Sequence, residues 1–352
     1  MRVKLEDVCE RGSSDLKQSD IVDVNGDYPI YGASGYIGNV NFYHQNKPYV
    51  AVVKDGAGIG RTFLHPAKSS VIGTLQYLLP KANVLPEYLY YVVRYMRLEK
   101  YYTGATIPHI YFKNYKNEQF NLDSLDKQAI IIAILGKCEK IIAAKEHVLQ
   151  KLDELIKARF VEFFESENDV YEEIQLEEIA DIVSGITKGR KTKSTNLRKV
   201  PYMAVSNVKD GYIDWTTVKT ILATEDEIEQ YRLIPDDVLM TEGGDPDKVG
   251  RGSIITEPPI DCIHQNHIFR VRLDENQILP GFFSAFLQSP KAKTYFLRAA
   301  KQTTGIASIN MKQLRGLPTI VPPMDKQLEY VRISEQIDKS KLFFHASHNF
   351  HS

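Results

Sequence analysis

The sequence lacks the features of a secreted or membrane-embedded protein. It has three cysteines among 352 residues, Cys9, Cys138 and Cys262, an odd number spread too far apart for a disulfide framework, which predicts a reducing compartment. No apolar run approaches the roughly 20 residues that a membrane-spanning helix needs. The first residues, MRVKLEDVCERG, lack the apolar core of a signal peptide. We therefore expect a cytoplasmic protein with no membrane partner.

The sequence also lacks an excess of either charge. Lysine and arginine number 44 against 45 acidic residues, so net charge does not mark a nucleic-acid-binding protein. Residues 187–199, TKGRKTKSTNLRK, depart from this balance because they include several basic residues and no acidic one. Such a segment gains affinity for a duplex by releasing counterions from phosphates. A solvated loop is an equally acceptable interpretation.

The sequence does contain an internal repeat, in which one unit occurs twice. Its composition, with 43% hydrophobic residues, is that of an ordinary globular protein. YPIYGASGYIGNV (residues 28–40) is answered by VPYMAVSNVKDGYID (residues 200–214), and each precedes a hairpin around a glycine-rich turn. A further strand then leads into a helix started by proline, LPEYLYYVVRYM or LPGFFSAFLQS, and each unit closes on Asp-Lys-Gln. The shared order of these signals predicts the duplication of a whole domain.

Between the two units the apolar pattern changes from the period of a strand to that of a helix. Apolar residues recur every seven positions in two columns across residues 123–166, with no proline and one glycine. A helix of this length spans roughly 60 Å, so we expect a rigid spacer between two domains, with a partner helix along its apolar stripe. The residues predicted to pack there are Ile131, Leu135, Cys138, Ile142, Leu149, Leu152, Ile156 and Phe163.

Motifs that would give the chain its own chemistry are missing. DGAGIGR, residues 55–61, has neither the order of a phosphate-binding loop nor a following helix. Cys262, His264 and His267 lie at a strand entry without a second ligand pair, so we assign them structural or DNA-facing roles. The Pro-Pro pairs lack the neighbours of an adenine methyltransferase motif, and Glu242 lacks the nearby lysine of a metal-dependent nuclease. We predict no catalytic residue and no metal site in this chain.

The repeated motifs resemble the specificity subunits of type I restriction-modification systems. The resemblance rests on YPIYGASGYIG, the glycine hairpin, the Asp-Lys-Gln start of a heptad helix ending in ARFVEFF, and the two-fold repetition; it covers almost the whole chain. It implies an α+β fold with two pseudo-repeated α/β target-recognition domains at residues 1–122 and 167–322. Long helices at residues 123–166 and 323–352 would join these domains as an antiparallel coiled coil.

The second helix is expected to stop near Lys341, shorter than the resemblance implies. Three consequences remain open. The first is that the chain is inactive, and the second is that it pairs with a second copy, which restores the missing helix. The third is that the chain represents a truncated or phase-variable allele.

The resemblance also implies the partners. Each domain is expected to read one half of a bipartite, asymmetric double-stranded DNA site. Two modification (methyltransferase) subunits and ATP-dependent restriction subunits are expected to dock on the chain. S-adenosylmethionine, ATP and Mg²⁺ are then cofactors of those partner subunits, and none is expected in this chain. Two alternatives are a DNA-acting methyltransferase or nuclease with its own catalytic site, and a coiled-coil scaffold that binds no DNA.

DNA contact is predicted for the glycine-containing loops of both units. Glycine permits close approach of a backbone, lysine and arginine suit phosphate and guanine, and amide side chains suit adenine. An ordinary hairpin turn is the alternative for each residue. The predicted contacts are Tyr31, Ser34, Tyr36, Lys54 and Arg61 in the first unit and Lys188, Arg190, Lys191, Lys193, Asn207, Lys248, Arg251, Gln302 and Thr303 in the second.

Overall fold

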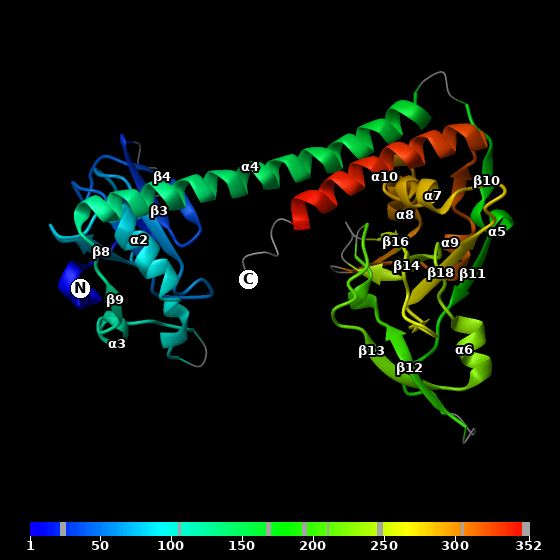
Figure 1. Ribbon diagram of the computed structural model, residues 1–352, viewed down its shortest axis with the longest axis horizontal. Coiled ribbons are helices and arrows are strands. Elements are labelled where there is room, and N and C mark those ends of the chain that lie inside the picture. The colour runs from blue at the N-terminus through cyan, green and yellow to red at the C-terminus, as the bar shows by residue number, and fades with distance from the viewer. Residues whose placement is uncertain are drawn as a thin grey trace. The chain divides into compact units, whose positions relative to one another are not determined.

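The computed structural model describes residues 1–21, 26–104, 107–166, 170–191, 196–209, 211–244, 249–303 and 306–346, without the side chains of residues 302, 303, 306 and 342–346. The chain divides into two compact units, unit 1 (Met1–Ala144) and unit 2 (Lys145–Ser352), whose elements are labelled in Figure 1. The division falls inside one continuous helix, α4 (Leu125–Phe164), which confirms the helix predicted for residues 123–166. Within the described ranges, every helix is too short or too polar to cross a membrane.

Unit 1 is built on a four-stranded sheet and a three-stranded sheet. Its elements before α4 are β1 (Arg2–Lys4), α1 (Leu5–Val8), β2 (Cys9–Ser13), η1 (Gln18–Ile21), β3 (Tyr28–Gly32), β4 (Gly35–Val40), β5 (Tyr49–Val53), β6 (Thr62–His65), β7 (Ser70–Val71), β8 (Leu75–Pro80), α2 (Pro86–Tyr95), η2 (Leu98–Tyr101), α3 (Phe112–Tyr115) and β9 (Gln119–Asn121). The sheets have the strand orders β2-β8-β5-β6 and β4-β3-β7, and β1 pairs with β9.

Unit 2 repeats these sheets and adds a third. Its elements after α4 are β10 (Glu173–Gln175), α5 (Leu176–Ile179), β11 (Ala180–Ser184), β12 (Arg198–Met203), η3 (Val205–Asn207), β13 (Lys219–Ala223), α6 (Glu225–Tyr231), β14 (Val238–Thr241), β15 (Gly243–Gly244), β16 (Gly252–Ile254), β17 (Ile263–His264), β18 (Ile268–Leu273), α7 (Pro280–Phe286), α8 (Pro290–Ala299), β19 (Lys301–Thr303), β20 (Ile306–Ser308), α9 (Met311–Arg315), β21 (Pro318–Ile320) and α10 (Met324–Ala346).

The two units share one topology, which confirms the predicted duplication at the level of the fold. The order β11-β18-β14-β16 matches β2-β8-β5-β6, and β13-β12-β17 matches β4-β3-β7. In both small sheets the middle strand is antiparallel to one neighbour and parallel to the other. The strand pair β10-β21 corresponds to β1-β9. Unit 2 adds the sheet β15-β20-β19.

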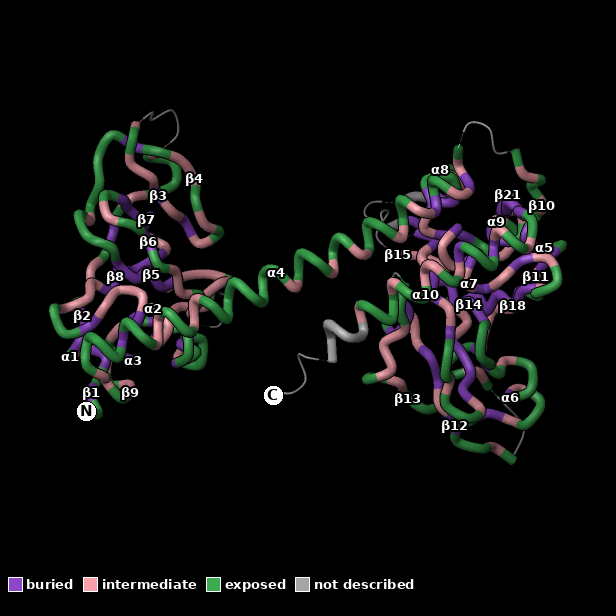
Figure 2. The backbone as a smooth tube through the Cα atoms, turned by 45° about the horizontal axis from the view of Figure 1, so that its top comes forward, coloured by how far each residue is buried: buried purple, intermediate pink, exposed green. Residues whose placement is uncertain are grey.

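In both units the four-stranded sheet separates two hydrophobic cores. Alternate side chains of a strand point to opposite faces. In unit 1, Val50 and Val52 therefore enter the core formed with α1 and α2, and Tyr49 and Ala51 enter the core formed with the small sheet. Val238 and Leu239 of unit 2 divide in the same way between two cores. Figure 2 shows these central strands as buried, which explains their continuous apolar sequences.

The repeated Asp-Lys-Gln tripeptide anchors the helix that closes each unit. The side chain of Gln128 is fully buried; its Oε1 accepts a hydrogen bond from Leu85 N at 2.9 Å, just before α2. Its Nε2 donates to the backbone oxygens of Asn83 and Asp123. Gln327, also fully buried, makes the matching bonds with Leu279 N, Gln277 O and Pro322 O. The tripeptide therefore recurs because the same backbone junction recurs.

Helix α10 lies antiparallel along the last turns of α4 within unit 2 (Figure 1). Tyr330 packs against Phe160 and Phe164 with ring centroids 5.5 and 5.4 Å away, and Lys341 Nζ lies 2.7 Å from Asp153 Oδ1. The prediction that this helix stops near Lys341 is wrong, because it continues to Ala346. The added residues contain neither proline nor glycine, so the backbone continues as a helix although the apolar heptad pattern has ended.

Candidate nucleic-acid interface

A row of aromatic rings in unit 1 runs from buried His65 of β6 to the exposed end of the β3–β4 hairpin. His65 is buried and stacks on Tyr31 with 3.9 Å between ring centroids. Tyr31 meets Tyr36 edge to face, and Tyr36 is 62% exposed. Burial lowers the pKa of His65 to about 4, so its ring is neutral near pH 7. Ser34 lies exposed in the hairpin turn, so both Ser34 and Tyr36 are accessible to a ligand.

The glycine loop of unit 1, residues 54–61, turns through two left-handed glycines. Gly56 and Gly60 have φ of +90° and +82°, which glycine adopts without strain. Arg61 is exposed, and its Nε donates to Gly58 O at 3.3 Å. Lys54 is half-buried, with its Nζ 3.9 Å from Asp55 Oδ2. Both predicted cations therefore reach the surface of this loop.

A second loop, which was not among the contact regions predicted for unit 1, lies against the glycine loop. Its residues 107–111 follow Thr103, and Gly56 N donates to Pro108 O at 3.0 Å. His109 Nδ1 lies 2.7 Å from Asp55 Oδ1. The similarity of Thr103-Gly104 to Thr304-Gly305, beside the predicted Gln302 and Thr303, was the available signal. Its exposed apolar and aromatic side chains include Ile107 and Tyr111, and Tyr102 is exposed just before Thr103.

The basic segment of unit 2, residues 187–199, contains exposed lysines and two arginines that form ion pairs, Arg190 with Glu227 and Arg198 with Glu225 and Asp261. Lys188 and Lys191 are exposed. Arg190 Nε donates to Glu227 Oε1 at 2.6 Å, and its Nη2 bonds the other carboxylate oxygen. This pairing lowers the pKa of the Glu227 carboxyl group. Arg190 therefore braces α6, and the free charge of the segment comes from the lysines. The predicted Lys193 lies outside the described residues.

The prediction of DNA contact by Asn207 is wrong, because its side chain is fully buried and satisfied. Its Nδ2 donates to Asp214 O at 2.9 Å and to Thr217 Oγ1 at 3.0 Å, and its Oδ1 accepts from Ala204 N at 3.0 Å. The amide therefore holds a turn together and offers nothing to a base.

The remaining predicted contacts of unit 2 lie near its glycine turn. Arg251 is half-buried, and its buried Nε has no hydrogen-bond partner among the described residues. Lys248 lies outside the described residues. Gln302 and Thr303 belong to β19, but their side chains are also outside the described part.

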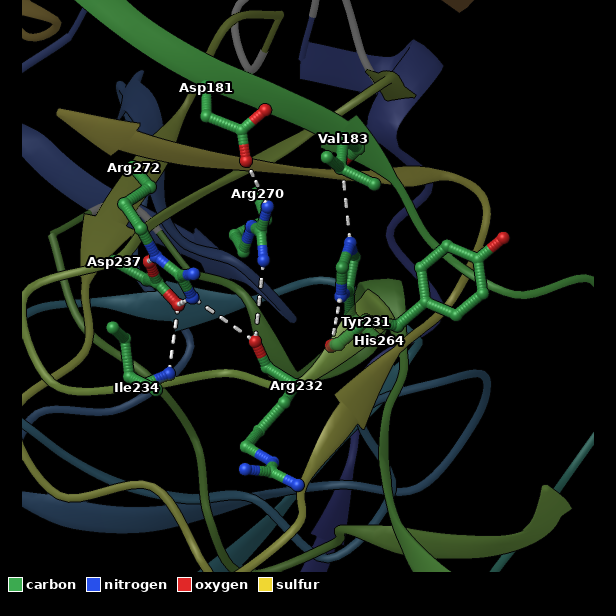
Figure 3. Close-up of polar contacts among 9 residues, drawn as sticks. All are labelled: Asp181, Val183, Tyr231, Arg232, Ile234, Asp237, His264, Arg270 and Arg272. Atoms are coloured by element: carbon green, nitrogen blue, oxygen red, sulfur yellow. Dashed lines mark hydrogen bonds and ion pairs between the residues drawn. The ribbon is translucent and has the colours of Figure 1, made fainter. Parts of the chain in front are cut away.

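An arginine–aspartate network fills one side of the unit 2 sheet (Figure 3). Arg270 is buried and bonds Asp181, while Arg272 makes a bidentate pair with the fully buried Asp237 at 2.8 and 2.9 Å. Burial lowers the pKa of Arg270, although its ion pair keeps it charged at neutral pH. The network connects β11 and β18 with Asp237, the residue before β14, and only its Asp181 end is largely exposed, at 64% of the side chain. Because the arginines are committed to these aspartates, its role is structural.

The cysteine and histidines near β17 do not converge on one point. Cys262 is buried, and burial raises its pKa to about 12. His264 is also buried, with Nδ1 3.1 Å from Tyr231 O and Nε2 3.3 Å from Val183 O (Figure 3). Burial lowers the pKa of His264 to about 4. His267 instead faces Glu242, with Nδ1 2.5 Å from Oε2. His264 is therefore structural, and His267 is on the surface.

The predicted packing residues of α4 have three different environments. Ile131 packs on the core of unit 1, while Ile156 and Phe163 pack on the core of unit 2. Leu135, Leu149 and Leu152 are partly exposed. Cys138 is exposed and Ile142 is 42% exposed, so the described residues of this chain do not bury them, and their predicted packing against a helix or a partner subunit stays a prediction. Among the described side chains, Lys341 of α10 pairs with Asp153 of α4, one turn or more beyond these two positions.

Comparison with known proteins gives one family for both units. The family model described as Type I restriction modification DNA specificity domain matches residues 1–154 and residues 168–346. The chain is similar to the type I restriction enzyme EcoKI specificity subunit of Escherichia coli, 24% identical over 177 residues, and to the StySPI specificity subunit of Salmonella potsdam, 26% identical over 162 residues. These matches cover 49% and 45% of this chain but only 37% and 34% of the relatives.

The fold is similar to that of a solved structure as well. The S subunit of the type I restriction-modification system from M. genitalium superimposes with a TM-score of 0.59 and 14% sequence identity. The superposition covers 99% of this chain and 91% of that structure. The likeness therefore extends over both units and the long helices.

Proposed function

The chain belongs to the type I restriction modification DNA specificity family, and we propose that it selects the DNA sequence on which such a system acts. Each unit binds one half of a bipartite, asymmetric duplex site in the cytoplasm. Modification and restriction subunits dock on the chain and carry out the chemistry with S-adenosylmethionine, ATP and Mg²⁺. This chain contributes no catalytic residue and holds no cofactor.

One observation carries this proposal: the same fold occurs twice, with different side chains on equivalent loops. The strand orders of the two four-stranded sheets match element by element. The β2–β3 connection of unit 1 nevertheless exposes Asp15 and Asp20, whereas the corresponding β11–β12 connection of unit 2 exposes Lys188 and Lys191. Two domains that share a fold but expose different side chains are suited to bind two different half-sites, because base edges are distinguished by the side chains that contact them.

The helices supply the proposed surfaces for assembly. We infer that α4 and α10 form an antiparallel coiled coil, supported by the packing of Tyr330 on Phe160 and by the Lys341–Asp153 ion pair. Nearer the start of α4, Ile134 is 55% exposed and Ile141 is 57% exposed. Figure 2 shows much of this helix as exposed. Exposed apolar side chains at helical spacing favour docking of partner subunits.

The test is reconstitution with a modification subunit. The chain is co-purified with its modification subunit, and methylated adenines in genomic DNA are mapped by sequencing. We expect methylation at one bipartite sequence, and none from either protein alone. Replacing unit 1 by that of a relative should change one half-site and preserve the other. Methylation by the isolated chain, or a change in both half-sites, would contradict the proposal.

The phosphate contacts have a separate measurement. Lys188→Ala combined with Lys191→Ala removes two exposed cations. We expect the slope of log K against log salt to fall by about 2, with little change in sequence preference, because each lost phosphate contact releases about one counterion fewer. The exposed Lys312 of α9 supplies the control variant, Lys312→Ala. An unchanged slope in the double variant would show that this segment does not contact phosphate.

A further inference from the structure

The same backbone frame recurs at one end of the four-stranded sheet in both units. In unit 1, Lys54 N donates to Thr74 O at 3.0 Å, and Lys54 O accepts from Ile110 N at 2.9 Å. In unit 2, Glu242 N donates to His267 O at 3.0 Å, and Glu242 O accepts from Ile309 N at 2.8 Å. Lys54 and Glu242 therefore occupy the same place in two copies of one frame.

Strand register supports this equivalence on both sides of the two residues. Just before them, Val53 pairs with Leu75 in unit 1 and Thr241 pairs with Ile268 in unit 2. Just after them, Asp55 bridges to His109, and Gly243 pairs with Ser308. We name these positions the sheet-end frame, which comprises Lys54, Asp55, Thr74 and His109 in unit 1 and Glu242, Gly243, His267 and Ser308 in unit 2.

The side chains on the sheet-end frame differ between units and reach solvent. Unit 1 presents the ammonium group of Lys54 beside the Asp55–His109 pair, all partly exposed. Unit 2 presents the carboxylate of Glu242, 36% exposed, beside the imidazole of His267, 56% exposed. Glu242, Gly243, His267 and Ser308 line one hollow of the surface together with Val205. At the first position of the frame, the charge is therefore opposite in the two units.

We propose that the sheet-end frame reads one base pair in each half-site, with Lys54 reading guanine and Glu242 reading cytosine. The inference rests on the proposed function. A lysine donates to O6 and N7 of guanine in the major groove, whereas a carboxylate accepts from the N4 amino group of cytosine. Phosphates repel a carboxylate, so Glu242 at a duplex surface is matched to a base amino group and not to the backbone. His109 and His267 are positioning residues that orient the two carboxylates.

The experiment exchanges the residues at the first position of the frame. The chain, co-purified with its modification subunit, is incubated with a pool of duplexes of randomised sequence, and the bound fraction is sequenced. Glu242→Lys should replace a preference for cytosine by one for guanine at a single base pair. Lys54→Glu should cause the reverse change in the other half-site. Each variant should lose roughly tenfold to a hundredfold in affinity for the original sequence. Glu275→Gln, at an exposed acid of unit 2, serves as the matched control.

The outcomes separate this inference from the function on which it rests. If the unmodified complex enriches no sequence, the proposed function itself fails. If it enriches a bipartite sequence that both folded variants retain, the function stands and the assignment of the sheet-end frame is overturned. A folded variant that loses a whole half-site also overturns it, because one reader sets one base pair. Using both variants keeps the test decisive if one exchange prevents folding.

Discussion

Units 1 and 2 differ in the side chains that cover one face of their four-stranded sheets. The face is the same in both units, but it carries aromatic rings in unit 1 and arginine–aspartate pairs in unit 2. The strand registers place Tyr77 of unit 1 where Arg270 stands in unit 2, opposite Ala51 and Leu239 respectively. Tyr77 accepts a hydrogen bond from Val71 N at 2.9 Å, whereas Arg270 bonds Asp181. Aromatic rings and ion pairs both fill the space, although the buried Nε of Arg270 has no hydrogen-bond partner among the described residues. The fold is therefore specified by the continuous apolar sequences of the central strands and by the shared backbone junctions, while the side chains on this side of the sheet are free to vary.

The largest expected effect comes from breaking the ionic layer of unit 2. Arg272→Ala leaves the fully buried Asp237 carboxylate without its bidentate partner. We expect unit 2 to lose about 3–5 kcal/mol of stability, because a buried charge without its partner is costly. Leu79→Ala at the equivalent position of unit 1 should cost about 1–2 kcal/mol, because Leu79 is partly exposed and no charge is left buried.

Hydrogen exchange followed by mass spectrometry measures both variants, because it reports each unit separately. Arg298→Ala, at an exposed arginine of α8, is the control and should change stability by less than about 0.5 kcal/mol. Equal losses from Arg272→Ala and Leu79→Ala would mean that the two layers do not differ in the way described here.

The buried histidines should make both units sensitive to acid despite their different surroundings. Burial lowers the pKa of His65 and of His264 to about 4 in the folded chain, against about 6.5 when unfolded. Between these values the unfolded chain binds protons that the folded chain does not. Stability should therefore fall as pH drops from about 6.5 to about 4, by on the order of 3 kcal/mol for each histidine. Above and below this window their contribution is constant.

Calorimetric unfolding across this pH range checks the expectation. His65→Phe retains an aromatic ring against Tyr31 and loses no hydrogen bond of Nε2, which has no partner among the described residues. The pH dependence of unit 1 should weaken in this variant while that of unit 2 remains. A pH dependence that His65→Phe leaves intact would show that other groups in unit 1 cause it.

The sequence was informative where residues adjacent along the chain form the feature. The order of hairpin, strand and helix predicted the duplication, and the heptads predicted α4. Asn207 was misjudged, because its partners Asp214 and Thr217 reach it only after the chain turns back. The sheet-end frame was missed as a unit, because Asp55, Thr74 and His109 come together only through strand register. The exposure of Ile142 depends on where α10 meets α4, which an apolar pattern does not reveal.

The shared junctions should respond alike in the two units. Gln128→Ala and Gln327→Ala each remove a buried amide that accepts from the backbone before α2 or α7. We expect each unit to lose about 2–3 kcal/mol, because a buried N–H group is left unpaired. The protection of the Leu85 and Leu279 amides against hydrogen exchange is the direct measurement. Gln336→Ala, at an exposed position of α10, is the matched control. Clearly unequal losses would show that the repeated junctions are not energetically equivalent.

The smallest expected effect concerns the tyrosine hydroxyl groups of the aromatic layer of unit 1. The experiment tests whether these hydroxyl groups contribute to the stability of unit 1. Tyr77→Phe keeps the ring but leaves the buried Val71 N–H without its acceptor, and should cost about 1–2 kcal/mol. Tyr49→Phe should cost less, because Ser69 Oγ also lies 2.7 Å from Pro66 O and can donate there instead. Chemical denaturation resolves this order. If the two variants are equally stable, the layer is held by ring packing alone, and its difference from the ionic layer of unit 2 is greater than the structure implies.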